Sequence, residues 1–422
     1  MSGVETGKKK QQLVAGSIGN VLEWYDFAVY GFLAPFMGPL FFPDDNTVVA
    51  LIKTYGIFAA GYFMRPIGGI LFGHIGDRIG RKQALQWSIS MMAIPTVIVG
   101  LLPTHEQIGI WAAVLLVGLR MIQGVSVGGE LIGSMAYLVE TARPDRRGFA
   151  GSWSVFGGVA GILLGSAVVA LLELSLDEEA MASWGWRVPF ISGLIIFFIG
   201  SWMRRTMEES EEFQAADTKD SENPFKVVIR DHLPRVLHAS ATIFLYGTSF
   251  YMLFVWMPTY LSDIVKPGIP HALEVNSIAM VLLLITIPIA GWISDKVGRK
   301  NVLMPSIVLL GIVAYPAFLG LDMGNENIDL LIMLGFAVLV GFIQGPVPVT
   351  MVDTFPVGVR YTAIAMSYNL TLAFFGGTAP LVCTWLIELT GDLASPAIYL
   401  SVLAAISAIC LAVLKPDRGA SY

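Results

Sequence analysis

Long apolar stretches recur along the whole chain, and short polar stretches separate them. Most are close to or longer than the roughly 20 residues that a helix needs to cross a bilayer core of about 30 Å. The pattern therefore predicts an all-α membrane protein with twelve spanning helices. We expect these helices at 13–41, 49–72, 83–102, 108–139, 148–173, 186–204, 235–262, 274–293, 301–321, 328–352, 361–388 and 395–414.

One long polar stretch, 205–234, divides the predicted helices into two sets of six. It is rich in acidic residues and is interpreted as a solvated cytoplasmic linker without chemistry of its own. The predicted organisation is a cytoplasmic tail at 1–12, a six-helix bundle at 13–204, the linker at 205–234, a second six-helix bundle at 235–414 and a cytoplasmic tail at 415–422.

The composition agrees with a lipid environment. Of 422 residues, 55% are hydrophobic and 14% are charged, whereas about 25% of the residues of a soluble domain are charged. The net charge of −6 comes largely from acidic loop clusters, and nothing in it suggests a nucleic-acid partner. Both cysteines fall in apolar helices and the histidines show no ligand spacing, so neither a disulfide nor a metal site is expected.

The distribution of Lys and Arg predicts the orientation of the chain. Nearly all of these residues fall on one side of the predicted threading, while Arg187 and Lys266 are the obvious ones on the other side. Cytoplasmic loops of membrane proteins are enriched in Lys and Arg. Both termini are therefore expected to be cytoplasmic. The first apolar segment is too long for a signal-peptide core, so no cleaved signal is expected.

A ten-residue pattern occurs once in each predicted bundle. Gly73–Lys82 reads GHIGDRIGRK after the second predicted helix, and Gly291–Lys300 reads GWISDKVGRK after the eighth. Duplicated halves around a central site are a common construction among secondary transporters.

These two segments resemble the signature loop of the major facilitator superfamily, which has the form G-x-x-x-D-R/K-x-G-R-K/R. The resemblance implies two pseudo-symmetric six-helix bundles. It also implies a gating role for Asp77 and Arg81, and for their repeats Asp295 and Arg299. In that superfamily the aspartate faces the N-terminus of a helix in the opposite half, where the helix dipole favours a negative charge.

Further motifs resemble the metabolite:proton symporter family. They are Gly19–Phe27 (GNVLEWYDF), Arg65–Gly69 (RPIGG), Arg120–Glu130 (RMIQGVSVGGE), Trp184–Phe190 (WGWRVPF) and Glu208–Phe213 (EESEEF).

Members of that family import proline and glycine betaine, α-ketoglutarate, citrate or shikimate on the proton gradient. The resemblance implies a bacterial inner-membrane protein that works as a monomer and needs no cofactor. The chain is similar to the proline/betaine branch in EWYDF and SVGGE. It ends at Tyr422 without the coiled coil of the osmosensing members, so osmotic gating is not expected and the substrate stays open.

Charged residues inside the predicted helices are the candidates for function, because a charge in hydrocarbon is costly unless it faces the protein interior. The candidates are Glu23, Asp26, Lys53, Arg65, Arg120 and Glu130, and all of them lie in the first half. The second half contributes aromatic and amide groups instead. A substrate with a carboxylate and an apolar body would suit this division.

Asp26 is the favoured proton-coupling residue, with Glu23 and Glu130 as alternatives. Burial disfavours the ionised form of a carboxyl group and a neighbouring arginine favours it, so a carboxyl between these effects can load and release a proton. Alternatively, Glu23 or Glu130 forms a permanent structural ion pair with Arg65 or Arg120.

Arg120 is the first candidate for binding a substrate carboxylate, because its fixed fork binds carboxylates bidentately and stays charged. Structural pairing with Asp26 or Glu23 is the alternative, and both can hold if substrate and protonation compete for the arginine. Arg65 is assigned a structural charge. Lys53 either contacts substrate or extends to water. Tyr30, Gln123, Tyr251, Trp256, Tyr368 and Asn369 are further candidate substrate contacts, although each aromatic ring can equally be a packing residue.

The function predicted from these features is proton-coupled import of a small carboxylate-bearing metabolite by alternating access. No phosphate-binding loop indicates ATP as the energy source, and no nucleophile–base arrangement indicates an enzyme. A drug:proton antiporter of the same superfamily is the main alternative, and a ligand-binding receptor without transport is a further one.

Overall fold

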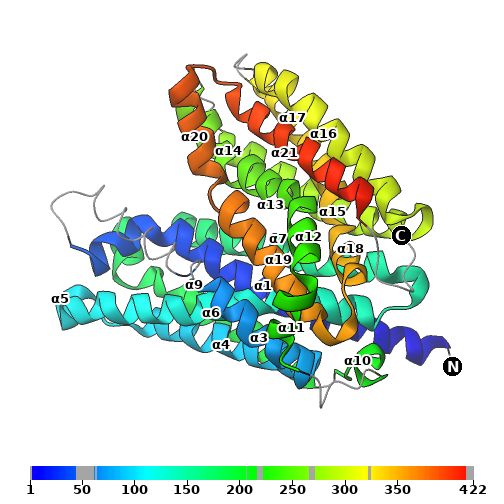
Figure 1. Ribbon diagram of the computed structural model, residues 1–422. Coiled ribbons are helices and arrows are strands. Elements are labelled where there is room, and N and C mark those ends of the chain that lie inside the picture. Colours follow the sequence, from blue (N-terminus) through cyan, green and yellow to red (C-terminus); the bar gives the residue numbers. More distant parts are fainter. Residues whose placement is uncertain are drawn as a thin grey trace. The chain divides into compact units, whose positions relative to one another are not determined.

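The computed structural model describes residues 2–43, 61, 64–205, 207–215, 222–265, 271–321 and 325–414 (Figure 1). This described part is helical and contains no strand. It forms two compact units, and the chain passes from one to the other after Thr141, after Val155 and after Phe225. Unit 1 is Met1–Thr141 with Phe156–Phe225, and unit 2 is Ala142–Val155 with Lys226–Tyr422. Lys53 and most of the second predicted span lie outside the described residues.

The helices that begin in unit 1 are mostly long, with short turns between them. They are α1 (Ser2–Phe41), α3 (Arg65–Arg78), α4 (Arg81–Leu101), α5 (His105–Ile108), α6 (Ile110–Glu140), α8 (Glu178–Ala180), η2 (Met181–Gly185), α9 (Arg187–Arg205), α10 (Glu211–Ala215) and α11 (Pro224–Val227).

Unit 2 contains the remaining helices. They are η1 (Pro144–Arg146), the start of α7 (Arg147–Ser175), η3 (Val228–His232), α12 (Leu233–Thr242), α13 (Phe244–Phe250), η4 (Tyr251–Trp256), α14 (Met257–Thr259), η5 (Tyr260–Ile264), α15 (Ala272–Val297), α16 (Arg299–Leu321), α17 (Glu326–Gln344), α18 (Val347–Thr354), η6 (Val357–Val359), α19 (Arg360–Thr371), η7 (Leu372–Gly376), α20 (Ala379–Thr390) and α21 (Ser395–Val413).

Ten helical segments in the described part are long and apolar enough to cross a membrane, and they coincide with the third to twelfth predicted spans. Two of these spans, Pro224–Ser262 and Val357–Thr390, consist of several consecutive helices joined by π-helical turns such as η4 and η7. The first predicted span lies within α1. That helix contains the polar residues Asn20, Glu23 and Asp26, which lower its hydropathy.

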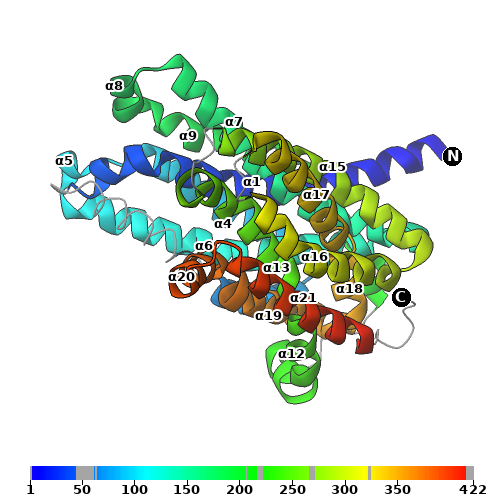
Figure 2. The ribbon, with the colours of Figure 1, turned by 90° about the horizontal axis from the view of Figure 1, so that it is seen from above.

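The two units repeat one pattern of helix pairing. In unit 1, α3 packs on α6, α4 packs on α6 and α9, and α1 packs on α9. The corresponding contacts in unit 2 are α15 on α17, α16 on α17 and α21, and α12 on α21. Figure 2 shows α1, α4, α6 and α9 gathered as neighbours in unit 1. The predicted duplication therefore extends from the loop motif to the arrangement of helices.

Within unit 1 the apolar residues point both inward and outward. An inner stripe of α1, including Tyr25, Val29 and Leu33, packs in a core with Trp186 and Phe190. On α9, Ile195, Phe198 and Trp202 are each more than 60% exposed. A helix that is apolar on its exposed side while its polar groups lie inside suits a lipid surround.

Candidate functional site

Polar side chains of unit 1 form a column along the contact between α1 and α6. On α1, Gly19, Glu23, Asp26 and Tyr30 are spaced by four, three and four residues, so they share one face of the helix. Glu130 of α6 lies against Gly19, whereas the N-terminal half of α6 meets Asp26. The two helices therefore run antiparallel along the column.

Asp26 and Arg120 form a buried ion pair at the centre of the column. Oδ2 of Asp26 accepts a hydrogen bond from Nη1 of Arg120, and the two side chains are 0% and 3% exposed. The sequence had left open whether Arg120 pairs with Asp26 or with Glu23, and in this structure it pairs with Asp26.

Gln123 fixes the geometry of this ion pair. Its side-chain oxygen accepts a hydrogen bond from Arg120 at 2.8 Å. Its Nε2 donates to Oδ1 of Asp26 at 3.0 Å and to Oγ1 of Thr96 on α4 at 2.8 Å. Both oxygens of Asp26 therefore have a partner. Gln123 contacts both members of the ion pair and also a third helix, α4.

Arg120 retains hydrogen-bonding capacity although it is buried. Its Nε and Nη2 have no hydrogen-bond partner among the described residues. Its guanidinium carbon lies 3.8 Å from the centre of the Tyr30 ring, a cation–π arrangement, and 5.6 Å from that of Phe27. A buried arginine with two unused donors is chemically suited to receive a second anionic group.

Glu130 forms a second buried ion pair, and its partner is Arg204 of α9. Oε1 of Glu130 bonds to Nη2 of Arg204, and Oε2 accepts from Ser88. Arg204 also donates to the backbone oxygens of Leu85 and Ala15. The partner predicted for Glu130 was Arg65 or Arg120. Arg204 ends a predicted helix on the side where the basic residues gather, yet its side chain is fully buried.

Glu23 lies between these two ion pairs on the same face of α1. It is 2% exposed, and its Oε2 has no hydrogen-bond partner in the described part of the chain. The guanidinium of Arg65 on α3 lies over the rings of Trp24 and Phe27, at 5.8 and 5.5 Å. Arg65 therefore packs against Trp24, which directly follows Glu23, and against Phe27, one helical turn further on.

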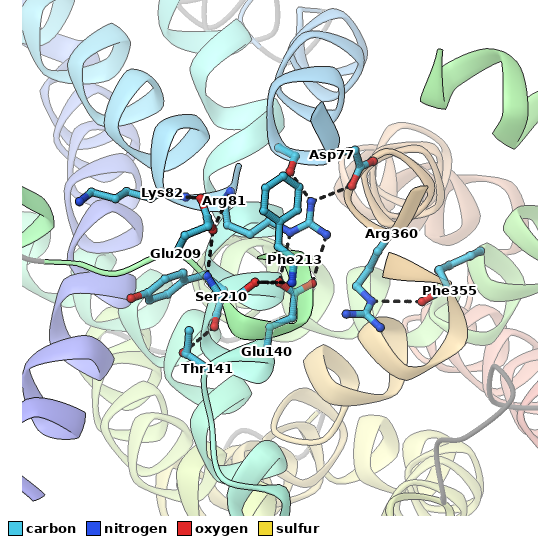
Figure 3. A network of polar contacts seen from close by, with 12 residues as sticks. Asp77, Arg81, Lys82, Glu140, Thr141, Glu209, Ser210, Phe213, Phe355 and Arg360 are labelled. Carbon is cyan, nitrogen blue, oxygen red and sulfur yellow. Dashed lines mark hydrogen bonds and ion pairs between the residues drawn. The ribbon is translucent and has the colours of Figure 1, made fainter. Parts of the chain in front are cut away.

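The first signature loop is part of a buried network at the start of α4 (Figure 3). Nη1 of Arg81 donates to Asp77 at 2.8 Å, and its Nη2 donates to Glu140 of α6 at 3.1 Å. The three side chains are fully buried. Ser210 donates to Glu140 at 2.7 Å. Glu140 was not among the residues singled out from the sequence.

Residues 207–215 of the predicted linker pack onto this network. The carboxylate of Glu209 accepts hydrogen bonds from the backbone N–H groups of Arg81 and Lys82, at 3.1 and 3.2 Å. The Phe213 ring lies 5.1 Å from the Arg81 guanidinium. The interpretation of this stretch as a solvated tether is therefore wrong for these residues, because Glu209 caps α4.

The second signature loop interacts with the start of α7 in unit 2. Asp295 accepts hydrogen bonds from the backbone N–H groups of Gly148 and Phe149, at 2.6 and 2.8 Å. The resemblance had placed this aspartate at a helix N-terminus, and α7 provides one. Asp353 lies beside Arg147 and Arg299, at 3.1 and 3.3 Å. Asp353 was also missed in the sequence.

The aromatic candidates of unit 2 differ in how fully they are engaged. Tyr368 packs edge-on against Tyr246 with ring centres 5.8 Å apart, and Tyr251 packs edge-on against Phe250 at 5.8 Å. Nε1 of Trp256 donates to Thr384 at 3.1 Å. Nδ2 of Asn369, which is 6% exposed, has no hydrogen-bond partner among the described residues.

The described residues contain no group of three His, Cys, Asp or Glu side chains that could hold a metal ion. Asp26 with Arg120 and Glu130 with Arg204 form carboxylate–guanidinium pairs instead. A carboxylate can bind a proton, and a guanidinium can bind an anion.

Comparison with known proteins places the chain in a family. Residues 17–380 match the Major Facilitator Superfamily. The proline/betaine transporter of Salmonella typhimurium is 35% identical over 420 residues, which cover 96% of this chain and 83% of that protein. The glycine betaine/proline/ectoine/pipecolic acid transporter OusA of Dickeya dadantii is 34% identical over 99% of this chain and 86% of that protein.

The fold is also that of a solved transporter. The structure of the proton:xylose symporter XylE aligns with a TM-score of 0.82 at 19% identity, covering 99% of this chain and 98% of that one. The chain belongs to the Major Facilitator Superfamily. It is a multi-pass membrane transporter and not an enzyme, and the predicted two-bundle, twelve-helix fold class is confirmed.

Proposed function

We propose that this protein is a proton-coupled symporter that imports a small carboxylate-bearing solute by alternating access. The solute is a zwitterion of the proline or betaine type or a small organic acid, and the proton gradient is the energy source. The names of the relatives from Salmonella typhimurium and Dickeya dadantii support this substrate class.

The observation that carries the proposal is the buried pair of Asp26 and Arg120, in which two donor atoms of the arginine have no partner among the described residues. Protonation of Asp26 removes the negative charge that holds Arg120. The guanidinium then offers its donors to the carboxylate of the solute. Arg120 pairs first with Asp26 and then with the carboxylate of the solute. Proton binding to Asp26 and substrate binding to Arg120 are therefore coupled.

Two neighbours keep Arg120 in place while its partner changes. The Tyr30 ring lies over the guanidinium and the Gln123 side-chain oxygen accepts a hydrogen bond from it. Neither contact requires Asp26 to be ionised. The arginine therefore stays positioned when the ion pair opens, and less entropy is lost when the solute binds.

The candidate substrate contacts of the second half stay Tyr251, Trp256, Tyr368 and Asn369. The rings of Tyr251, Trp256 and Tyr368 are buried against neighbouring rings, and Nδ2 of Asn369 has no hydrogen-bond partner among the described residues. Lys53 stays a candidate substrate contact. Asp77 with Arg81, and Asp295 with Arg299, are assigned to gating, and Arg65 to structure. We also propose cytoplasmic termini in a bacterial inner membrane and a monomeric working unit.

The proposal is tested by uptake into proteoliposomes with an imposed inward-acid pH gradient. Labelled proline, betaine, α-ketoglutarate, citrate and shikimate are compared with and without a protonophore. We expect one compound or one chemical class to accumulate and the protonophore to abolish the accumulation. Arg120→Ala should lose uptake at low substrate, whereas the exposed Arg230→Ala serves as the matched control.

Uptake by Arg120→Ala close to that of the wild type would remove the assigned role of this arginine. Expulsion of an apolar cation, with no accumulation of any carboxylate, would instead establish the drug:proton antiporter.

A further inference from the structure

Three buried carboxyl groups lie along the column between α1 and α6, and two of them are saturated. Asp26 receives Gln123 on one oxygen and Arg120 on the other. Glu130 bonds to Arg204 through Oε1 and accepts from Ser88 through Oε2. Each of these carboxyl groups therefore has a partner for both oxygens, and one partner of each is a buried guanidinium.

Glu23 is the exception. It is as buried as the other two carboxyl groups, yet its Oε2 has no hydrogen-bond partner among the described residues. A buried carboxylate with an unsatisfied oxygen is unfavourable, and uptake of a proton relieves the cost. Glu23 is therefore the member of the column best suited to be neutral while Asp26 is paired with Arg120.

The charged groups around Glu23 oppose one another. Arg65 of α3 is a cation and Glu130 of α6 is an acid, and both lie near enough to act on Glu23. Arg120 and Arg204 are each engaged by another carboxylate. From α4, the groups that reach the column are uncharged, namely Ser88 and Thr96. A group between opposing charges can change protonation state when either neighbour changes.

The positions of Glu23 and Asp26 along α1 indicate the direction in which a proton would move between them. Glu23 lies three residues before Asp26, which is about 4.5 Å of helix rise. Side chains at this spacing meet on one helix face. The N-terminal end of α1, towards which Glu23 lies, is the cytoplasmic end in the orientation proposed above. The step from Asp26 to Glu23 is therefore a step inward.

We infer that Glu23 is the acceptor of the proton that Asp26 releases on the inward side. The O–H bond of protonated Asp26 breaks, a new O–H bond forms on the ionised carboxylate of Glu23, and the total charge of the two groups is unchanged. Asp26 then pairs with Arg120, which is the arrangement observed here, and Glu23 passes the proton to the cytoplasmic water. This inference rests on the proposed function of Asp26.

The test compares Glu23→Gln with Asp26→Asn in proteoliposomes, with two readouts. The first is accumulation of solute on an inward-acid gradient. The second is counterflow, the exchange of labelled for unlabelled solute at equal pH, which needs no net proton release. We expect Glu23→Gln to lose accumulation, so that inner and outer solute concentrations become equal, and to retain counterflow.

Accumulation by Glu23→Gln equal to that of the wild type would overturn the acceptor role. If Asp26→Asn accumulates solute, the proposed function itself fails, and the two failures are thereby distinguishable. If Glu23→Gln loses both activities, Glu23→Asp decides. Accumulation by Glu23→Asp, which keeps a carboxyl group, supports proton transfer through this position. Loss of accumulation by Glu23→Asp refutes it, whether counterflow is retained or lost.

Discussion

Arg204 and Glu130 lie 74 residues apart in the chain and form an ion pair in which the two side chains are 0% and 2% exposed. Arg204 also donates to two backbone oxygens, so it joins α9 to α1, α4 and α6. Removal of one member of such a pair leaves a buried charge without compensation, and this typically costs about 3–5 kcal/mol.

We predict that Arg204→Met lowers the free energy of unfolding by about 3–5 kcal/mol, because Glu130 then keeps an uncompensated charge. The double variant Arg204→Met with Glu130→Gln should recover much of this loss, since no buried charge remains. Thermal unfolding of the purified protein in detergent measures both. A double variant less stable than Arg204→Met would contradict the charge argument.

Gly19 provides the space for this ion pair, and a matched glycine on the same helix tests that role. A Cβ at Gly19 would meet the Glu130 carboxylate and the Arg204 guanidinium, whereas a Cβ at Gly31 would have nothing within 4 Å. We predict that Gly19→Ala destabilises the protein while Gly31→Ala is neutral or stabilises it by up to about 1 kcal/mol through helix propensity. Equal melting temperatures for the two variants would contradict this.

Most of the fold could be predicted because the length of an apolar helix is dictated by the bilayer. The predicted helix at 83–102 corresponds to Arg81–Leu101, and that at 395–414 corresponds to Ser395–Val413. The π-helical turns at Tyr251–Trp256 and Leu372–Gly376 could not be predicted in this way, because hydropathy records how apolar a segment is and not its hydrogen-bond register.

The candidate site could be predicted in part. Asp26 and Arg120 were singled out because buried charges need partners, and their pairing was one of the alternatives considered. Arg204 was missed because Arg204 and Arg205 together end an apolar helix. Which of two adjacent arginines points inward depends on how α9 is rotated against α1 and α4, and the sequence of one helix does not contain that rotation.

Glu209 was missed for a different reason, since a cluster of acidic residues in a polar stretch usually lies in solvent. Its carboxylate instead accepts the backbone N–H groups of Arg81 and Lys82. We predict that Glu209→Ala destabilises unit 1 by about 1 kcal/mol, as loss of a helix cap does. Glu208→Ala, at an exposed neighbouring position, is the control, and chemical unfolding in detergent is the measurement.

The corresponding prediction in unit 2 concerns Asp295. Its two oxygens accept from Gly148 and Phe149 at the N-terminus of α7, where the helix dipole also favours the charge. Asp295→Asn retains one acceptor and loses the charge, so we expect a loss of about 1 kcal/mol, and a larger loss for Asp295→Ala. If both variants were as stable as the wild type, the cap would contribute nothing.

A last prediction distinguishes the charge of Arg120 from its shape. Lysine keeps the positive charge but lacks the planar fork that contacts Asp26, Gln123 and the Tyr30 ring together. We therefore expect Arg120→Lys to raise the KM for the solute strongly while the protein stays folded. Uptake kinetics paired with a melting curve measure this, and an unchanged KM would show that a point charge is sufficient.

The pairing of Asp26 with Arg120 also makes membrane voltage a means of telling the two solute classes apart. If one proton replaces the arginine at Asp26, a zwitterionic solute crosses together with one net positive charge, and each 100 mV of membrane potential adds about 2.3 kcal/mol of driving force. A singly charged acid with the same proton crosses without net charge and gains nothing from the potential. Current recorded during uptake would therefore identify the charge of the solute before its chemical identity is known.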